Sequence, residues 1–184
     1  VYQFDGDGAE IGQFRTKIVN ITRTANELKM PISVGKWDLV LISGDGVENV
    51  TPPVRGSARS ALKMYENKPV GGFLPSMPEF RSARIKGQLI QANTSHQADA
   101  ILARNVAMVK VVIDDASGFE VAGDHKIYPL DVQTTLNWDG GLYPDKDNPD
   151  VSTPPMQGAL TISNDTGRRH KSNAAVFIVP AHPG

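Results

Sequence analysis

The chain has 184 residues, of which 40 % are hydrophobic and 21 % are charged, the composition of a globular protein with a core of its own. A net charge of −1 gives no electrostatic case for binding nucleic acid, and the absence of cysteine excludes disulfides and thiol chemistry. No stretch approaches the roughly 20 apolar residues of a membrane-spanning helix.

The first fifty positions predict short strands separated by glycine turns. "VYQF" is a strand that runs into the turn "DGDG", and residues 11–21 form a second strand. In residues 28–42, apolar residues alternate on both sides of Gly35, which predicts a hairpin with its bend at that glycine. Trp37 shares the phase of the apolar residues in the second strand of this hairpin, so we expect it in the core.

Residues 51–80 interrupt the strand pattern. Ser57 is a candidate cap for a short helix from Ala58 to about Glu66, and Pro69 lies beyond its end. "GGFLPSMPEF" is predicted to be irregular, because its two prolines oppose regular strand pairing. "ARIKGQLI" then returns to the strand pattern.

Residues 101–115, "ILARNVAMVKVVIDD", place Arg104 and Lys110 inside an apolar, β-branched run. Helical spacing is also present, but the crowding of valine and isoleucine from 109 to 113 favours a strand. On a single strand, both basic side chains would project from the same face, because they are an even number of positions apart. We expect each to have a structural role with a partner in its own domain, and a contact with a neighbouring subunit is the alternative.

The last third of the chain predicts further strands in "FEV", "KIYPLDVQTTL", "ALTIS" and "AAVFIVPA", with a long loop over residues 137–158. Because nearly all regular structure is strand, the chain is predicted to be an all-β, antiparallel sandwich with one short helix and long loops. We divide it into a β-sandwich domain of residues 1–168 and a terminal segment of residues 169–184. That segment is either a last strand or the start of a second domain.

No pattern of catalytic or metal-binding residues is present in the sequence. The four histidines lack ligand spacing, there is no Gly-x-Ser-x-Gly elbow, and the turn that begins at Asp5 does not follow the EF-hand spacing. We therefore predict no catalytic, cofactor or metal site, and a protein that is not an enzyme. Four aspartates of the long loop are expected to be solvated rather than to hold a cation: Asp139, Asp145, Asp147 and Asp150.

Two other features are candidates for contacts with other molecules. Trp138 and Tyr143 form a candidate loop contact, because exposed aromatic rings stack on glycans and other ligands. Arg168 and Arg169 begin the basic run "RRHK", which is a candidate protease-sensitive site; a solvated turn is the favoured interpretation.

Four motifs occur in an order that resembles the fimbrillin-like proteins of Bacteroidales, which are subunits, tips and anchors of protease-processed surface fimbriae. The motifs are "VYQFDGDG", "LKMPISVGKWDLVLISGDG", "GGFLPSMPEF" and "ADAILARNVAMVKVVI". Six residues match the family form "Leu-x-Arg-x-Val-Ala-x-Val-x-Val": Leu102, Arg104, Val106, Ala107, Val109 and Val111. The family's Pro-Met pair is split here, and Met108 stands where the family commonly has a basic residue. The resemblance covers roughly residues 1–115.

The resemblance implies a transthyretin-like Greek-key β-sandwich that is exported as a lipoprotein precursor to the outer membrane or the fimbrium. It implies cleavage by a trypsin-like protease that removes a first strand, and then assembly by strand exchange, in which the next subunit donates a strand to the exposed groove. A start without methionine fits a piece of such a precursor. The expected partners are other fimbrial subunits and host or bacterial surface ligands, with an adhesive role. The alternative is a secreted β-sandwich that binds a glycan or another ligand through loops around Trp138 and Tyr143.

Overall fold

The protein is all-β in this computed structural model. The structure describes residues 1–6, 12–25, 27–113, 123–130, 135–137, 142–143, 155–162 and 172–180, and for 135–137, 142–143 and 180 it describes the backbone only. Within these ranges every ladder between two strands is antiparallel, and the helices are two short 3₁₀ turns, η1 (Val47–Asn49) and η2 (Arg59–Ala61). Neither of these helices is long or apolar enough to cross a membrane.

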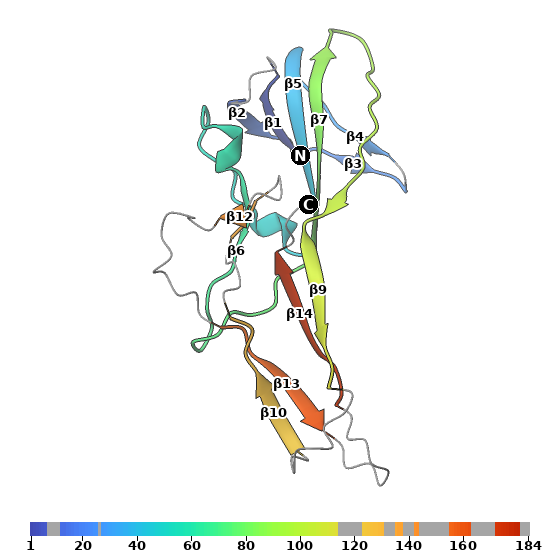
Figure 1. Ribbon diagram of the computed structural model, residues 1–184. Helices are drawn as coiled ribbons and strands as arrows, with labels where there is room; N and C mark the ends of the chain where they lie inside the picture. The colour runs from blue at the N-terminus through green and yellow to red at the C-terminus, as the bar shows by residue number, and fades with distance from the viewer. Residues whose placement is uncertain are drawn as a thin grey trace.

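A five-stranded sheet forms the broad end of the molecule (Figure 1). Its order is β2-β1-β5-β7-β8, with β1 (Tyr2–Asp5), β2 (Phe14–Lys17), β5 (Gly35–Gly44), β7 (Phe80–Ile90) and β8 (Ala103–Arg104). The predicted hairpin at the start of the chain is confirmed, because β1 pairs with β2. The other side of β1 pairs with β5, which places the first strand inside the sheet.

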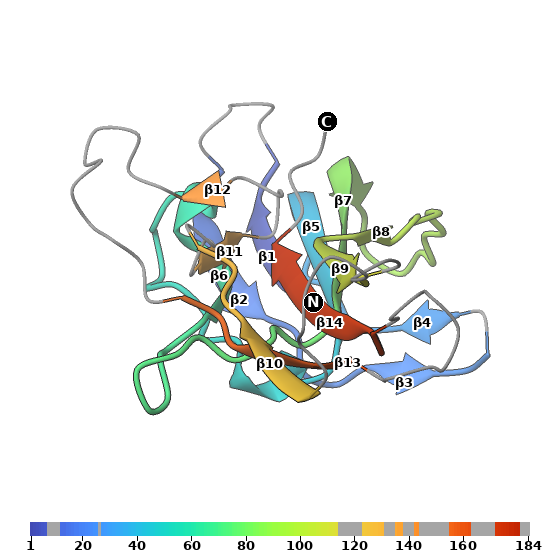
Figure 2. The same ribbon diagram turned by 60° about the horizontal axis from the view of Figure 1, so that its bottom comes forward.

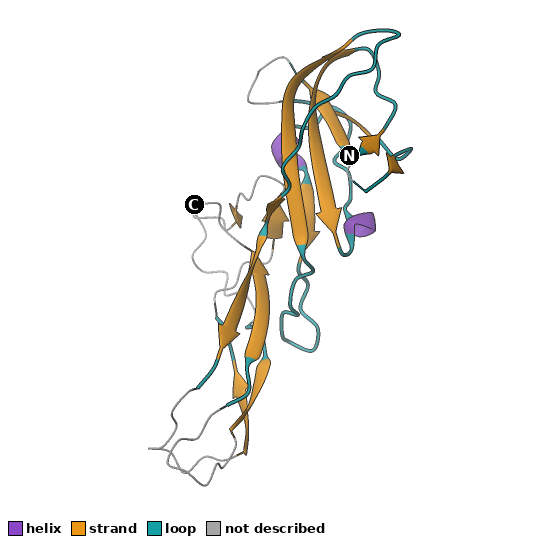
Figure 3. Cartoon of the chain, turned by 90° about the vertical axis from the view of Figure 1, so that its right-hand side faces the viewer, coloured by secondary structure: helices purple, strands orange, loops and turns teal. Residues whose placement is uncertain are grey.

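Shorter ladders complete the fold, and two of them extend into the narrow end of the molecule (Figure 3). These two are β9 (Val106–Val111) with β14 (Ala175–Pro180), and β10 (Gly123–Ile127) with β13 (Gly158–Ile162). β6 (Lys63–Glu66) pairs with β11 (Thr135–Asn137), which pairs with β12 (Leu142–Tyr143), and β3 (Thr22–Arg23) pairs with β4 (Leu28–Lys29). β14 lies in the predicted terminal segment and pairs with a strand of the predicted sandwich domain.

The main core joins the five-stranded sheet to β6. Tyr2 and Phe4 alternate along β1 and are both fully buried, and the ring of Phe4 meets that of Phe14 edge-on at a centroid distance of 5.5 Å. The buried members of this cluster are Tyr2, Phe4, Phe14, Val40, Val50, Leu62, Met64, Met77, Phe80 and Val106. Alternation along strands with one face inward accounts for most of these positions.

A second core lies at the narrow end, and its buried members are Leu74, Met156, Leu160, Ala175 and Phe177. The β9–β14 ladder reaches both cores. Val106 is part of the main core and Ile178 packs against it, whereas Val111 and Val179 pack against the second core. This ladder therefore connects the two ends of the molecule (Figure 1), and Figure 2 shows the same strands with the narrow end turned forward.

The predicted hairpin over residues 28–42 is wrong. Leu28 and Lys29 pair backward with Arg23 and Thr22, and β5 pairs with β1 and β7 instead. Gly35 has φ 140° and begins a long strand rather than a turn. β5 has a paired strand at each of its two edges and buries consecutive residues on both faces, as a strand in the middle of a sheet does, whereas a local hairpin supplies a partner at one edge only.

The predicted helix from Ala58 to Glu66 is also wrong. The chain forms η2 without a side-chain cap and then strand β6. Leu62 and Met64 are both buried in the main core. Two residues that are two positions apart share a face on a strand but not on a helix, so core packing overrides the helical signal.

Trp37 does not lie in the core as predicted. Its ring is half-buried, and its Nε1 donates a hydrogen bond to the Ser33 carbonyl oxygen at 2.8 Å. The register between β5 and β7 shifts between Trp37 and Leu39, so the even alternation on which the prediction depended is interrupted at that point.

Candidate functional site: the outer edge of β9

The stretch of residues 101–113 forms two strands rather than the one predicted. Asn105 separates β8 from β9, and its N–H donates to the Phe80 carbonyl oxygen at 2.9 Å. β8 pairs with β7, whereas β9 leaves the main sheet and pairs with β14. The strand is broken because its two halves belong to different ladders.

Arg104 binds a carboxylate of its own chain. Its Nη2 lies 3.1 Å from Oε1 of Glu79, and the same oxygen accepts from Nη2 of Arg81 at 2.8 Å. The hydrogen bond from Arg81, followed by the charges of Arg104 and Arg81, lowers the pKa of Glu79. In this geometry Arg104 helps to fix β8 to β7.

β9 has one paired edge and one outer edge. On the far side of β14, the Ile178 carbonyl oxygen accepts from the Met77 N–H at 3.0 Å, so the backbone groups of Ile178 point away from β9. Met108 is the register partner of Ile178, and in an antiparallel ladder its backbone groups therefore point away from β14. Across the described residues, no strand pairs with this outer edge.

Apolar side chains are exposed along β9 and just beyond it. Met108 is 64 % exposed, Val109 is 43 % exposed, and Val112 is also exposed. Val109 stands opposite Phe177, a fully buried ring of the second core. Because Val109 itself is partly exposed, it lies at the border of that core. Lys110 lies between these residues, and among the described residues no acidic side chain forms an ion pair with it.

The six family-motif residues have different environments along this stretch. Leu102 is exposed just before β8, and Arg104 makes the contact described above. Val106 is buried in the main core, and Ala107 and Val111 are half-buried on β9. The motif thus spans β8, the residue Asn105 that separates the two strands, and β9 with its outer edge.

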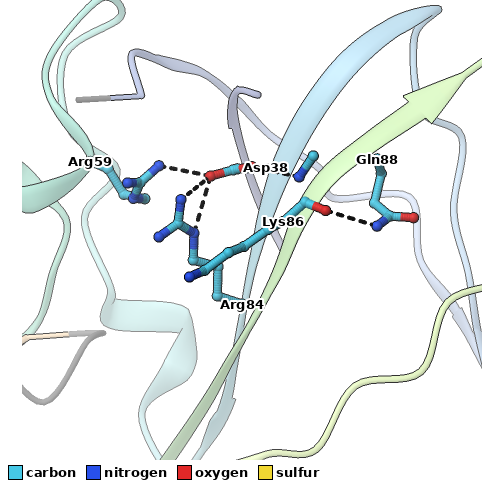
Figure 4. A network of polar contacts seen from close by, with 6 residues as sticks. Asp38, Arg59, Arg84, Lys86 and Gln88 are labelled. Atoms are coloured by element: carbon cyan, nitrogen blue, oxygen red, sulfur yellow. Dashed lines mark hydrogen bonds and ion pairs between the residues drawn. The ribbon is translucent and has the colours of Figure 1, made fainter. Parts of the chain in front are cut away.

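A buried charge cluster holds the middle of the main sheet (Figure 4). Oδ2 of Asp38 accepts from Nη1 of Arg59 at 2.8 Å and from Nε of Arg84 at 3.0 Å. Oδ1 accepts from the Gly87 N–H at 2.8 Å. Burial by itself would raise the pKa of Asp38, but the Gly87 N–H and the Arg84 and Arg59 guanidinium groups outweigh it and hold that pKa below its usual range.

This cluster is structural, because the hydrogen bonds to Asp38 occupy its carboxylate and connect β5, η2 and β7. This cluster was not predicted from the sequence. Its signal was an aspartate inside the apolar run "KWDLVLI", since an acid in a buried strand needs a cationic or N–H partner.

The other predicted contact residues fall at positions whose side chains the structure does not describe. Trp138, Arg168 and Arg169 lie outside the described residues, as do the four loop aspartates, and for Tyr143 only the backbone in β12 is described. In the part of the chain that the structure describes, no group of three or more histidine, aspartate or glutamate side chains is placed to hold a metal ion.

No protein-family model, curated protein or solved structure matches this chain. The motifs and the geometry of β9 are therefore the basis for a functional proposal.

Proposed function

We propose that this chain is a structural subunit of a fimbrillin-like surface fibre, to which a neighbouring subunit adds a strand along the outer edge of β9. One observation supports this most directly. β9 offers six residues in regular ladder geometry whose second edge has no described partner, and its exposed side chains are mostly apolar. An unpaired edge of this kind is a template for another strand.

Strand addition at this edge would complete the backbone hydrogen bonds of β9 and would also bury its exposed apolar side chains. An incoming strand would bond to the outward N–H and C=O groups of Met108 and Lys110. Its alternate side chains would lie beside Val109 and extend the second core outward. Fully burying one exposed side chain of this size contributes about 1.5–3 kcal/mol, and the added strand would bury the exposed part of Val109.

The finer features of the fimbrillin resemblance belong to the same proposal. We infer a transthyretin-like Greek-key topology, which fits the pairing of strands far apart in sequence, β1 with β5 and β9 with β14. Export as a lipoprotein precursor, processing by a trypsin-like protease and a location at the cell surface follow from the family motifs. A tip or an anchor would use the same edge, once, at the end of a fibre.

The test uses the precursor that contains this chain, treated with a trypsin-like protease and run without boiling on a denaturing gel. A ladder of regularly spaced bands that collapses on boiling is the expected result. Met108→Pro removes one outward N–H from β9 and leaves the hydrogen bonds to β14 in place, so it should abolish the ladder. Met108→Thr keeps the N–H and a strand-forming residue and should retain it.

A single band from the processed wild type would overturn self-assembly by strand addition. A ladder that Met108→Pro leaves unchanged would instead place assembly at another edge. Circular dichroism of both Met108 variants shows whether each one is folded.

A further inference from the structure

Among the residues that the structure describes, the outer edge of β7 is paired along only a small part of its length. β5 pairs with one side of β7 from Phe80 to Ile90, but on the other side β8 pairs only with Arg81 and Ser82. Further along, the Lys86 carbonyl oxygen accepts from the side-chain amide of Gln88 at 2.9 Å (Figure 4). The Gln88 side chain thus occupies a backbone acceptor on a part of the edge where no strand of the described residues is paired.

The connection that follows β7 lies beside this edge without pairing to it. Residues 91–104 are exposed throughout, and Ile101 is 90 % exposed. Figure 1 shows the connection leaving the far end of β7 and returning to β8 as an open arm. Its turn is fixed by polar contacts: Thr94 Oγ1 donates to the Gln91 carbonyl oxygen at 2.9 Å, and Asn93 has φ 55°.

We propose that residues 99–102 of this arm close onto the outer edge of β7 and lengthen β8. The register is already set, because Arg81 lies opposite Arg104 and Ser82 opposite Ala103. Continued without a shift, it places residues 102, 101 and 100 opposite 83, 84 and 85. Opposite residues in an antiparallel ladder alternate between hydrogen-bonded and non-hydrogen-bonded pairs. Because the Asn105 N–H donates to the Phe80 carbonyl oxygen, residues 105 and 80 are a hydrogen-bonded pair, and every second pair from there is bonded as well. In that alternation residue 99 is bonded to residue 86.

Two features favour this occupant over any other strand. Asp99 would arrive opposite Lys86, which is exposed, and opposite charges across a ladder stabilise it. The Asp99 N–H would replace the Gln88 amide on the Lys86 carbonyl oxygen. Both ends of the arm are joined to strands of the same sheet. The entropic cost of bringing the arm to the edge of β7 is therefore small.

Closure would end at the β-bulge in the β5–β7 ladder. Asp38 of β5 faces both Lys86 and Gly87, and Gly87 has φ 59°, so the edge of β7 turns away beyond this point. The closed arm pairs the backbone of Ile101 and protects an exposed edge from pairing with other chains. It uses no residue of β9, so the inference does not depend on the proposed function.

The experiment exploits the absence of cysteine from the chain. In the closed register, residues 85 and 100 form a non-hydrogen-bonded pair, whose geometry fits a disulfide. The double variant Ile85→Cys/Ala100→Cys should therefore oxidise at least about tenfold faster than the matched out-of-register variant Ile85→Cys/Ala98→Cys. Adding Asp99→Lys should slow the in-register disulfide, and adding Lys86→Glu as well should restore its rate.

Equal oxidation rates for the two pairs would overturn the proposal. In an arm that stays open, residues 98 and 100 encounter residue 85 equally often. The two variants share Ile85→Cys, so any effect of that change on folding is common to both. If it prevents folding, the wild-type protein decides by NMR. A close contact between the α-protons of Ile85 and Ala100 supports closure, and its absence refutes it.

Discussion

Arg81 and Arg104 lie directly opposite each other across the β7–β8 ladder, and a single carboxylate oxygen of Glu79 binds both. Like charges in this position destabilise a sheet. Glu79 precedes β7 by one residue and supplies the negative charge that lets the two arginines face each other. The arginine of the family-like motif is thus part of the attachment of β8 to the main sheet.

Glu79→Gln should loosen this attachment. Without the carboxylate, the two opposed guanidinium groups repel, and the amide of Ala103, in the β8–β7 ladder, should exchange with solvent faster, by less than about tenfold because the site is exposed. Hydrogen exchange measured by NMR checks this, with Glu66→Gln as the control at another exposed acid. Unchanged exchange at Ala103 would show that the bridge does not hold the ladder.

Asp38→Asn should strongly destabilise the fold. It leaves the buried Arg59 and the largely buried Arg84 without the carboxylate that they share, and removing one partner of a buried ion pair costs about 3–5 kcal/mol. The free energy of unfolding from denaturant titration is the measurement. Asp45→Asn, at an exposed acid of the adjoining turn, should change it by less than about 0.5 kcal/mol. Similar values for the two variants would contradict a role for the buried charge cluster.

Gly158→Ala should disturb the second core. A Cβ at this position would lie 2.4 Å from Cζ of Phe177, a fully buried ring that cannot move without repacking. Overpacking of this kind costs about 1–3 kcal/mol in the free energy of unfolding. In a Phe177→Leu background the ring is absent, so the same glycine change should cost less. Equal costs in the two backgrounds would show that the ring is not the obstacle.

Tyr2 should make stability decrease at alkaline pH. Burial raises its pKa from 10.0 to about 12, and its hydroxyl donates to the Val50 carbonyl oxygen at 3.3 Å. The folded state therefore retains the phenol proton where the unfolded state has begun to lose it. This contribution is complete below pH 10 and is lost as pH rises from there toward the folded pKa.

Tyr2→Phe should remove this alkaline loss and, because the hydrogen bond is long, should change stability at pH 8 by less than about 1 kcal/mol. Denaturant titrations between pH 8 and 11 compare the two proteins. Parallel stability curves over that range would refute the assignment.

Local patterns predicted the strands with clear alternation. The β1–β2 hairpin, the strand in "ARIKGQLI" and the late strands β13 and β14 all occur where alternating or β-branched runs end at turns. The irregular course of residues 71–79 follows from its prolines in the same local way. Each of these features depends on residues that are neighbours in the chain.

The candidate site could be located only in part. The motif from Leu102 to Val111 was identified from the sequence, but not the break at Asn105, because one asparagine, although disfavoured in strands, does not show that a strand leaves one ladder for another. The contact between Arg104 and Glu79 joins residues far apart in sequence. The partners of Asp38 come from η2 and β7, which the sequence did not place beside β5.

The sequence by itself determined that this protein is all-β, and where several of its strands lie, because alternation and turn chemistry act over a few residues. Only the tertiary structure decided which strands pair. Backbone hydrogen bonds are the same for every pair of strands, so the choice of partner is made by burial on both faces of β5 and by packing against two separate cores. That choice also left β9 with an outer edge that no described strand covers.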